Sequence, residues 1–156
     1  MTQADVTIIP YSEQYKEHIK ILNYEWLEKY FYVEPGDVEQ LSDPQFHIID
    51  KGGHIYFAKC NNEIVGTSSL IKLGMGEYEL AKMAVTEQYK GLGIGKVLLE
   101  HCIQKAREIN AVKLSLFSNT KLTSAIHLYK KYGFTEVQLP TNVHYERADI
   151  MMEKYL

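Results

Sequence analysis

The sequence predicts one α/β domain, in which strands and amphipathic helices alternate along the chain. Two observations carry this prediction. Apolar residues recur with a period of two in several short stretches and with a helical period in others. In addition, the run from Glu79 to Lys96 passes from a strand pattern, through closely spaced glycines, into a long helix pattern. A chain of 156 residues is long enough to bury a full core as a single domain over residues 1–156.

The expected elements follow from where these patterns start and stop. Ser12 is suited to cap the first helix, and Pro35-Gly36 separates that helix from a short second one. Asn61-Asn62 is a typical hairpin turn. The expected strands are 5–9, 54–60, 64–73, 77–85, 112–117, 134–139 and 145–154, and the expected helices begin near 12, 37, 94 and 121.

Composition limits the kinds of partner that the protein is expected to bind and the cell compartment in which it is expected. A net charge of −3 provides no basic surface, which argues against nucleic acid as the principal partner. The apolar runs are too short to cross a bilayer, and no basic-then-apolar signal sequence is recognised. Cys60 and Cys102 lie far apart without metal-ligand spacing, so we expect core packing, no metal and a cytoplasmic protein. The sequence leaves open whether the chain forms a homodimer.

The glycine-rich turn is suited to bind a phosphate group. Glycines at 91, 93 and 95 precede a helix whose first amides have no partner inside it and whose dipole is positive at that end. The dinucleotide fingerprint fails because its third glycine falls on Lys96. The phosphate loop of nucleotide triphosphatases fails because Lys90 and Val97 occupy its glycine and Ser/Thr positions.

Two motifs point to a known family. The pattern Gln88-x-x-Gly91-x-Gly93 fits the Q/R-x-x-G-x-G/A signature of the GNAT acetyltransferase superfamily. Downstream, Asn119 follows a predicted strand, and the stretch from Ala125 through Leu128-Tyr129 to Gly133-Phe134 is similar to the family's second signature. The chain therefore resembles a GNAT protein, firmly over about residues 54–138 and more loosely at its two ends.

The resemblance implies a fold and an activity. The fold would be a mixed, mostly antiparallel sheet of about seven strands with helices on both faces, in the order βααβββαβαββ. The activity would be direct transfer of the acetyl group from acetyl-CoA to a primary amine of a small molecule or peptide, in a complex of both substrates. The alternative is a catalytically silent acyl-CoA-binding or sensor module. A general nucleotide-binding domain is disfavoured by the two failed loop tests.

The resemblance also implies which residues hold the cofactor. The main chain of 83–85 would lie along the pantetheine arm, the turn would bind the pyrophosphate, and Asn119 would fix the arm. For the lysines, solvated surface charge is an equally good reading. The predicted cofactor-binding residues are Met83, Ala84, Val85, Gln88, Lys90, Gly91, Leu92, Gly93, Ile94, Gly95, Lys96, Asn119 and Lys131.

Two residues are candidates for proton transfer. An alkyl amine with a pKa of about 10.4 is almost entirely protonated at neutral pH, so a nearby carboxylate is useful as a base. Glu79 is the candidate base, and strand alternation places it on one face with Met83 and Val85; an exposed strand glutamate is the other reading. Tyr129 matches the family tyrosine that stands near the cofactor sulfur, which makes it the candidate acid.

For the acceptor amine, the sequence predicts only which segments form the wall of its binding site. In relatives, the first helices and the loop between the last two strands line it, and an aromatic and acidic lining would suit a cationic amine. Glu25, Tyr32 and Tyr145 are the candidate acceptor contacts. The full expected wall is Glu25, Tyr30, Phe31, Tyr32, Glu34, His144, Tyr145 and Arg147.

Overall fold

The computed structural model describes residues 5–143 and 145–156. Within them, the helices are α1 (Lys16–Tyr30), α2 (Pro35–Ser42), α3 (Ile94–Glu108) and α4 (Thr123–Lys131), with short helical turns η1 (Glu13–Tyr15), η2 (Gln45–Ile49) and η3 (Glu87–Tyr89). The strands are β1 (Thr7–Pro10), β2 (His54–Cys60), β3 (Glu63–Gly74), β4 (Glu77–Val85), β5 (Lys113–Ser118), β6 (Thr135–Val137) and β7 (Ile150–Tyr155).

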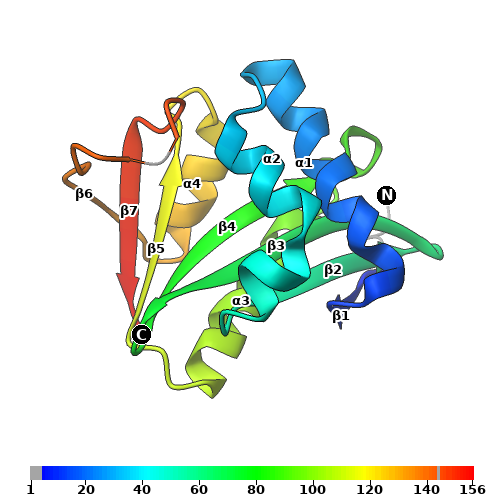
Figure 1. Ribbon diagram of the computed structural model, residues 1–156, viewed down its shortest axis with the longest axis horizontal. Helices are drawn as coiled ribbons and strands as arrows, with labels where there is room; N and C mark the ends of the chain where they lie inside the picture. The colour runs from blue at the N-terminus through cyan, green and yellow to red at the C-terminus, as the bar shows by residue number, and fades with distance from the viewer. Residues whose placement is uncertain (1–4, 144) are drawn as a thin grey trace.

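The strands form one sheet that is covered by helices on both faces (Figure 1). Its order is β1-β2-β3-β4-β5-β7-β6, and every pair is antiparallel except β4–β5. The helices α1 and α2 pack on one face around Ile19, Leu27 and Phe57. The helices α3 and α4 pack on the other, where Leu99 and Leu114 are fully buried. The mixed, mostly antiparallel seven-stranded sheet predicted from the sequence is confirmed.

Local turn signals in the sequence are also confirmed. Asn61 and Asn62 have φ values of 51° and 67°, and together they form the hairpin turn between β2 and β3. Asn110 has φ of 63° just after α3, the left-handed conformation that ends helices. The free cysteines Cys60 and Cys102 are buried in the core.

The last strand is shorter than the sequence suggested. We expected a strand over 145–154, but β7 begins only at Ile150. Before it, the side chains of Tyr145 and Arg147 form hydrogen bonds to residues of α2, and this segment is not a strand. Likewise, β6 covers Thr135–Val137 rather than 134–139. The short turn η2 is π-helical.

A β-bulge in the middle of β4 changes which face its side chains occupy. Ala81 lies opposite Ser69 and Ala84 lies opposite Thr67, so two residues of β4 stand against one of β3. Lys82 in this bulge has φ of 56°. Its carbonyl oxygen accepts a hydrogen bond from Asn23 Nδ2 at 3.3 Å, which satisfies a buried group in the bulge.

The bulge makes the predicted alternation along β4 wrong. Before it, Glu79 lies opposite Ile71, which packs on the α1 side. After it, Val85 lies opposite Gly66, where an added Cβ would approach Leu98 of α3 to 3.0 Å. Glu79 and Val85 therefore face opposite sides of the sheet, because the additional residue shifts the period-two pattern by one.

The parallel strands β4 and β5 pair only at their beginnings. Glu77 to Glu79 match Lys113 to Ser115, and beyond this point the two strands separate, as Figure 1 shows. The separation leaves unpaired backbone on both strands at the centre of the sheet. It opens a gap between them that only side chains or a ligand can fill.

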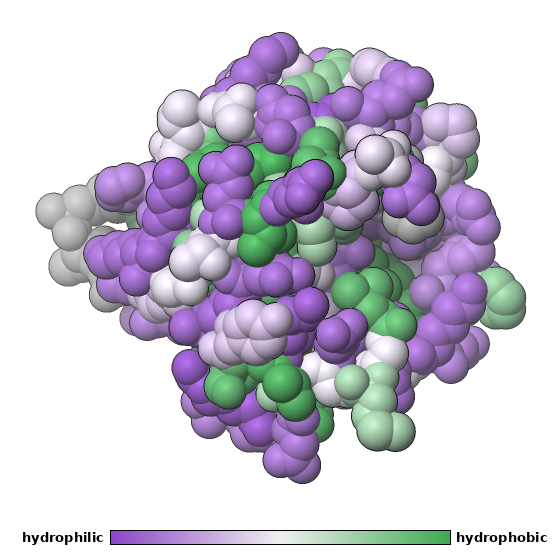
Figure 2. Space-filling view, turned by 90° about the vertical axis from the view of Figure 1, so that its left-hand side faces the viewer, coloured by the Kyte–Doolittle hydropathy of each residue, from purple (hydrophilic) through white to green (hydrophobic). Residues whose placement is uncertain are grey.

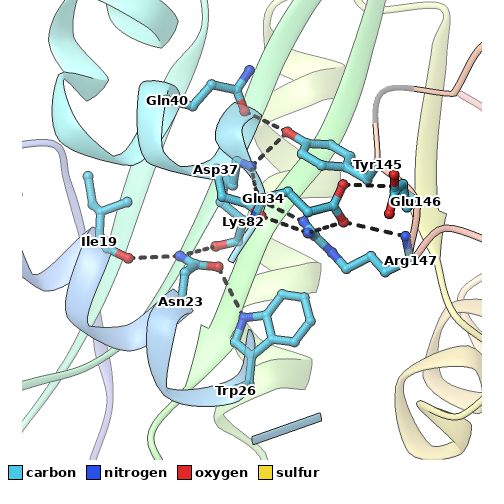
Figure 3. A network of polar contacts seen from close by, with 10 residues as sticks. All are labelled: Ile19, Asn23, Trp26, Glu34, Asp37, Gln40, Lys82, Tyr145, Glu146 and Arg147. Carbon is cyan, nitrogen blue, oxygen red and sulfur yellow. Dashed lines mark hydrogen bonds and ion pairs between the residues drawn. The ribbon is translucent and has the colours of Figure 1, made fainter. Parts of the chain in front are cut away.

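A buried ionic cluster holds the segment before β7 against α2 (Figure 3). Arg147 donates from Nη1 to Asp37 Oδ2 at 2.7 Å and from Nη2 to Asp37 Oδ1 at 2.8 Å. Arg147 Nη1 also lies 3.1 Å from Glu34 Oε2, and Glu34 Oε1 accepts the amide of Glu146 at 2.9 Å. Asp37 is 0 % exposed and Glu34 is 5 % exposed. Because each buried carboxylate has several donors, the segment is fixed in place.

None of the helices within 5–143 and 145–156 is both long and apolar enough to span a bilayer. Figure 2 shows the side of the molecule that is on the left in Figure 1, where hydrophobic side chains form small patches separated by hydrophilic ones.

Replacing Arg147 with Met is expected to lower the free energy of unfolding by about 3–5 kcal/mol, because it leaves buried carboxylates without their main partner. Burial by itself raises the pKa of Asp37, but the Arg147 hydrogen bonds, the Glu34 amide and Lys82 outweigh it and lower that pKa below its ordinary 3.8. The contribution is therefore fully present above about pH 4 and is lost as the pH falls through the folded pKa.

Urea denaturation from pH 7 to pH 2 measures both effects, with exposed Arg107→Met as the matched control. The difference between the wild type and Arg147→Met should shrink at the acid end. A loss no larger than that of Arg107→Met at pH 7 would contradict the assigned role of the cluster.

Candidate active site

The glycine turn between β4 and α3 adopts the conformations that the sequence predicted. Gly91 and Gly93 have φ values of 81° and 80°, and Gly93 is the N-cap of α3. A Cβ added at Gly91 or Gly95 would meet no atom within 4 Å. Packing within the chain therefore does not require Gly95, and open space lies before the first amides of the helix. Those amides have no acceptor inside α3, so the turn presents donors to an anion.

A cavity of about 730 Å³ connects this turn to the gap between β4 and β5. Its volume lies within the usual range for small-molecule and cofactor sites. One wall is β4 from Glu79 to Val85, and the opposite wall comes from the end of β5 and from α4. Residues of α1, together with Asp37, Tyr145 and Arg147, line the remaining side. One continuous space thus reaches from the glycine turn to the ionic cluster.

The structure brings most of the predicted site residues to this cavity. Those that line it are Glu79, Met83, Ala84, Val85, Lys90, Gly91, Gly93, Ile94, Gly95, Asn119, Tyr129 and Tyr145. The predicted residues placed outside its wall are Gln88, Leu92, Lys96, Lys131, Glu25 and Tyr32. Leu92 instead packs against the apolar cluster around Ile94 and Leu98.

Tyr129 lies on α4 with its ring in the core and one side on the cavity. It is 8 % exposed, and its ring meets Phe134 edge-on at 5.9 Å between centroids. Burial, followed by the nearby Cys102, raises the pKa of Tyr129 to about 12. The hydroxyl is therefore protonated at every physiological pH. It is a permanent hydrogen-bond donor and a weaker acid than an exposed phenol.

Glu79 lies on β4 immediately before the strands separate. It pairs with Ile71 on one side and Ser115 on the other, and it lines the cavity. Burial is the main reason that the pKa of Tyr145 is raised, and the charge of Glu79 adds to this shift. Burial lowers the pKa of Lys82, and the charge of Glu79 opposes that shift only in part. The carboxylate is thus within electrostatic range of the acceptor side of the cavity, where a cationic group would be stabilised.

Asn119 links the end of β5 to the segment before β7. Its Nδ2 donates to the carbonyl of Arg147 at 2.6 Å, and its Oδ1 accepts the amide of Lys121 at 2.8 Å. Both polar ends of the side chain are therefore used within the chain. In this structure Asn119 orders the cavity wall, and its predicted contact with a cofactor arm stays a prediction.

The structure brings part of the expected acceptor wall to the cavity: Tyr30, Phe31, Tyr145 and Arg147 line it, whereas Glu25, Tyr32 and Glu34 do not. Glu25 accepts a hydrogen bond from the backbone amide of Glu87 at 2.8 Å, and the Tyr32 hydroxyl donates a hydrogen bond to Glu146. His144 lies outside the described residues. The aromatic rings of this wall already face cations of the chain. Arg147 lies over Tyr145 at 4.4 Å and over Trp26 at 5.6 Å, and Lys121 lies over Phe31 at 5.5 Å.

Sequence reasoning missed Lys82 and Asp37. Lys82 Nζ lies 3.3 Å from Asp37 Oδ1 and donates to Tyr145 Oη at 2.8 Å, and both residues line the cavity (Figure 3). One signal was available in the sequence. Period-two alternation places Lys82 on the same strand face as the apolar residues Leu80 and Ala84, where a lysine is unusual. The bulge that turns Lys82 toward α2 has no signature in the sequence.

Comparison with known proteins agrees with this geometry. The model of the acetyltransferase (GNAT) family matches residues 19–134. An uncharacterized N-acetyltransferase, YvbK of Bacillus subtilis, is 30 % identical over 101 residues, or 63 % of this chain and 65 % of the relative. An N-alpha-acetyltransferase of Sulfurisphaera tokodaii is 35 % identical over 82 residues, 52 % of this chain and 47 % of the relative. The chain thus matches less than two thirds of the length of these curated relatives.

Solved structures extend the likeness to nearly the whole chain. A GNAT-family acetyltransferase of Staphylococcus aureus Mu50 superposes with a TM-score of 0.87 at 27 % identity, covering 97 % of this chain and 99 % of that one. The PaiA N-acetyltransferase of Thermoplasma acidophilum, solved in complex with coenzyme A, gives a TM-score of 0.78 at 18 % identity, covering 97 % and 99 %. With the family model matching most of its length, the chain belongs to the GNAT acetyltransferase family.

Proposed function

We propose that this protein transfers the acetyl group of acetyl-CoA to a primary amine of a small molecule or peptide, directly within a complex of both substrates. The carrying observation is the single cavity that joins the glycine turn to Glu79 and Tyr129. The diphosphate of the cofactor would lie against the first amides of α3, and its arm would follow β4 toward the gap. The coenzyme A complex of the Thermoplasma protein supports this choice of cofactor.

The two candidate groups come from different elements of the cavity wall, β4 and α4. Glu79 on β4 would attract the acceptor ammonium and take its proton, directly or through water. Tyr129 on α4 would donate a hydrogen bond to the sulfur as the C–S bond breaks. Its pKa of about 12 exceeds that of a thiol near 8.5, so its main effect is stabilisation of the developing thiolate.

A panel of primary amines tests this function through release of free coenzyme A thiol. The panel covers alkyl amines, diamines, amino acids and peptides with free N-termini, and a reaction without amine corrects for hydrolysis. We expect amine-dependent thiol release with at least one class. Binding of acetyl-CoA without release by any amine would instead favour a silent coenzyme-binding module, and no binding would reject the proposal.

Replacing Tyr129 with Phe is expected to lower kcat by about 10²-fold or more, the usual contribution of a positioned proton donor. The dissociation constant of acetyl-CoA should hardly change, because the ring remains packed against Phe134. Steady-state kinetics and calorimetry measure the two quantities. Tyr132→Phe, on the same helix end but outside the cavity wall, is the matched control. Unchanged kcat would remove Tyr129 from the reaction.

Replacing Glu79 with Gln is expected to alter the pH dependence of kcat/KM, either by shifting its rise toward higher pH or by depressing its plateau. The amide cannot take a proton from the acceptor ammonium, so more of the amine must reach the site already neutral. Glu77→Gln, on the same strand but outside the cavity wall, controls for loss of a strand carboxylate. A profile identical to that of the wild type would assign the base role elsewhere.

A further inference from the structure

Lys82 is a buried amine in the cavity for which the proposed reaction has no use. The residue is 9 % exposed and its side chain 5 % exposed, yet it lines the same space as Glu79 and Tyr129. The bulge in β4 turns it toward Asp37 of α2 and Tyr145 of the segment before β7, which are its partners. A lysine of this kind is both held in position and adjacent to the space where an acyl group would lie.

The surroundings of Lys82 make its amine easier to deprotonate to the nucleophilic form than the amine of an exposed lysine. Burial, together with the charge of Arg147, lowers the pKa of Lys82 even though Asp37 opposes the shift. Exposed Lys29 and partly buried Lys113 behave differently, because hydrogen bonds to carboxylates raise their pKa values. A neutral lysine is a good nucleophile toward a thioester, whereas an ammonium group is not.

The placement of Lys82 on β4 brings it beside the proposed path of the cofactor. The residues that follow it, Met83 to Val85, are those expected to run along the pantetheine arm. Glu79, three residues earlier, acts electrostatically on Lys82. The strand thus orders a carboxylate, an amine and the cofactor-binding backbone along one wall of the cavity.

We propose that Lys82 is itself acetylated by bound acetyl-CoA when no acceptor amine occupies the cavity. This inference rests on the proposed function, since it uses the same bound thioester. Nζ first loses one proton through a neighbouring carboxylate to water. The neutral nitrogen then forms a bond to the carbonyl carbon, the C–S bond breaks, and the second proton lost from nitrogen passes to the coenzyme A sulfur. The products are an amide, free coenzyme A and one released proton.

The fold tolerates this change of charge. Asp37 keeps both hydrogen bonds from Arg147 and the one from the Glu34 amide at 3.0 Å. The acetylated nitrogen retains one N–H to donate, so Tyr145 need not lose its contact. The acetyl group itself occupies the acceptor end of the cavity, so acetylated protein should bind acceptor amines more weakly while still binding coenzyme A.

The test is peptide mapping by mass spectrometry after incubating the folded protein of residues 1–156 with acetyl-CoA and no amine. We expect Lys82 to be acetylated faster than the exposed Lys20 by a factor on the order of 10² or more, because the thioester is held beside it. The rate constant should not depend on protein concentration, and an accepted amine should slow the modification. Lys82→Arg should remove this site, and Lys20→Arg should leave it unchanged.

The outcomes separate this inference from the proposed function. Acetylation of Lys82 no faster than that of Lys20, or equal rates in unfolded protein, would overturn the inference. If acetyl-CoA binds and amines are acetylated while Lys82 stays unmodified, the inference alone fails. If calorimetry finds no binding of acetyl-CoA, the proposed function fails first. The mapping is done on the wild-type protein, so the folding of a variant does not affect the result.

Discussion

At Lys82, strand β4 contains one residue more than the strand opposite it, and the site depends on this mismatch. The left-handed conformation of a non-glycine residue costs about 1–3 kcal/mol, so the surroundings must stabilise it. Asn23 does so by donating to the Lys82 carbonyl, while its own Oδ1 accepts the Trp26 indole N–H at 3.1 Å. Helix α1 is thereby anchored to the bulge, and the side chains of β4 change faces within the cavity wall.

The same strand then connects two chemically different regions. Glu79 lies where β4 leaves β5, and the strand continues past the bulge into the glycine turn that starts α3. Because a strand paired on its other side with β3 is stiff, the distance between the carboxylate and the helix amides is fixed. The proposed transfer needs this arrangement, since the anion site and the proton acceptor contribute only when the cofactor and the acceptor amine are held in register with one another.

The ionic cluster closes the cavity on the acceptor side. Taking Asp37, Glu34, Lys82 and Arg147 out of water is costly, and buried ion pairs are therefore weak evidence for stability. Here the geometry is favourable, because Asp37 accepts hydrogen bonds from Arg147, Lys82 and the Glu34 amide together. What the cluster provides is the relative position of the segments that carry these residues. The cluster holds α2, the bulge and the segment before β7 in one relative position.

Much of the fold was readable from the sequence. The glycine turn, the Asn61-Asn62 hairpin and the start of α3 follow from backbone requirements that neighbouring residues impose on one another. The two family motifs added the order of the elements along the chain, the mixed and mostly antiparallel type of the sheet, and the candidate roles of Glu79 and Tyr129. The prediction of a strand over 145–149 was wrong, because polar side chains of this segment form hydrogen bonds with partners outside the sheet.

The sequence by itself determined the glycine turn at the start of α3 and the identity of the residues along β4. Local backbone conformation and side-chain chemistry depend on residues that are adjacent in the chain. Only the tertiary structure decided what those residues face. Lys82 meets Asp37 across 45 residues and Tyr145 across 63, and Arg147 meets Asp37 across 110. Such contacts depend on how distant segments pack, which no local pattern of residues records.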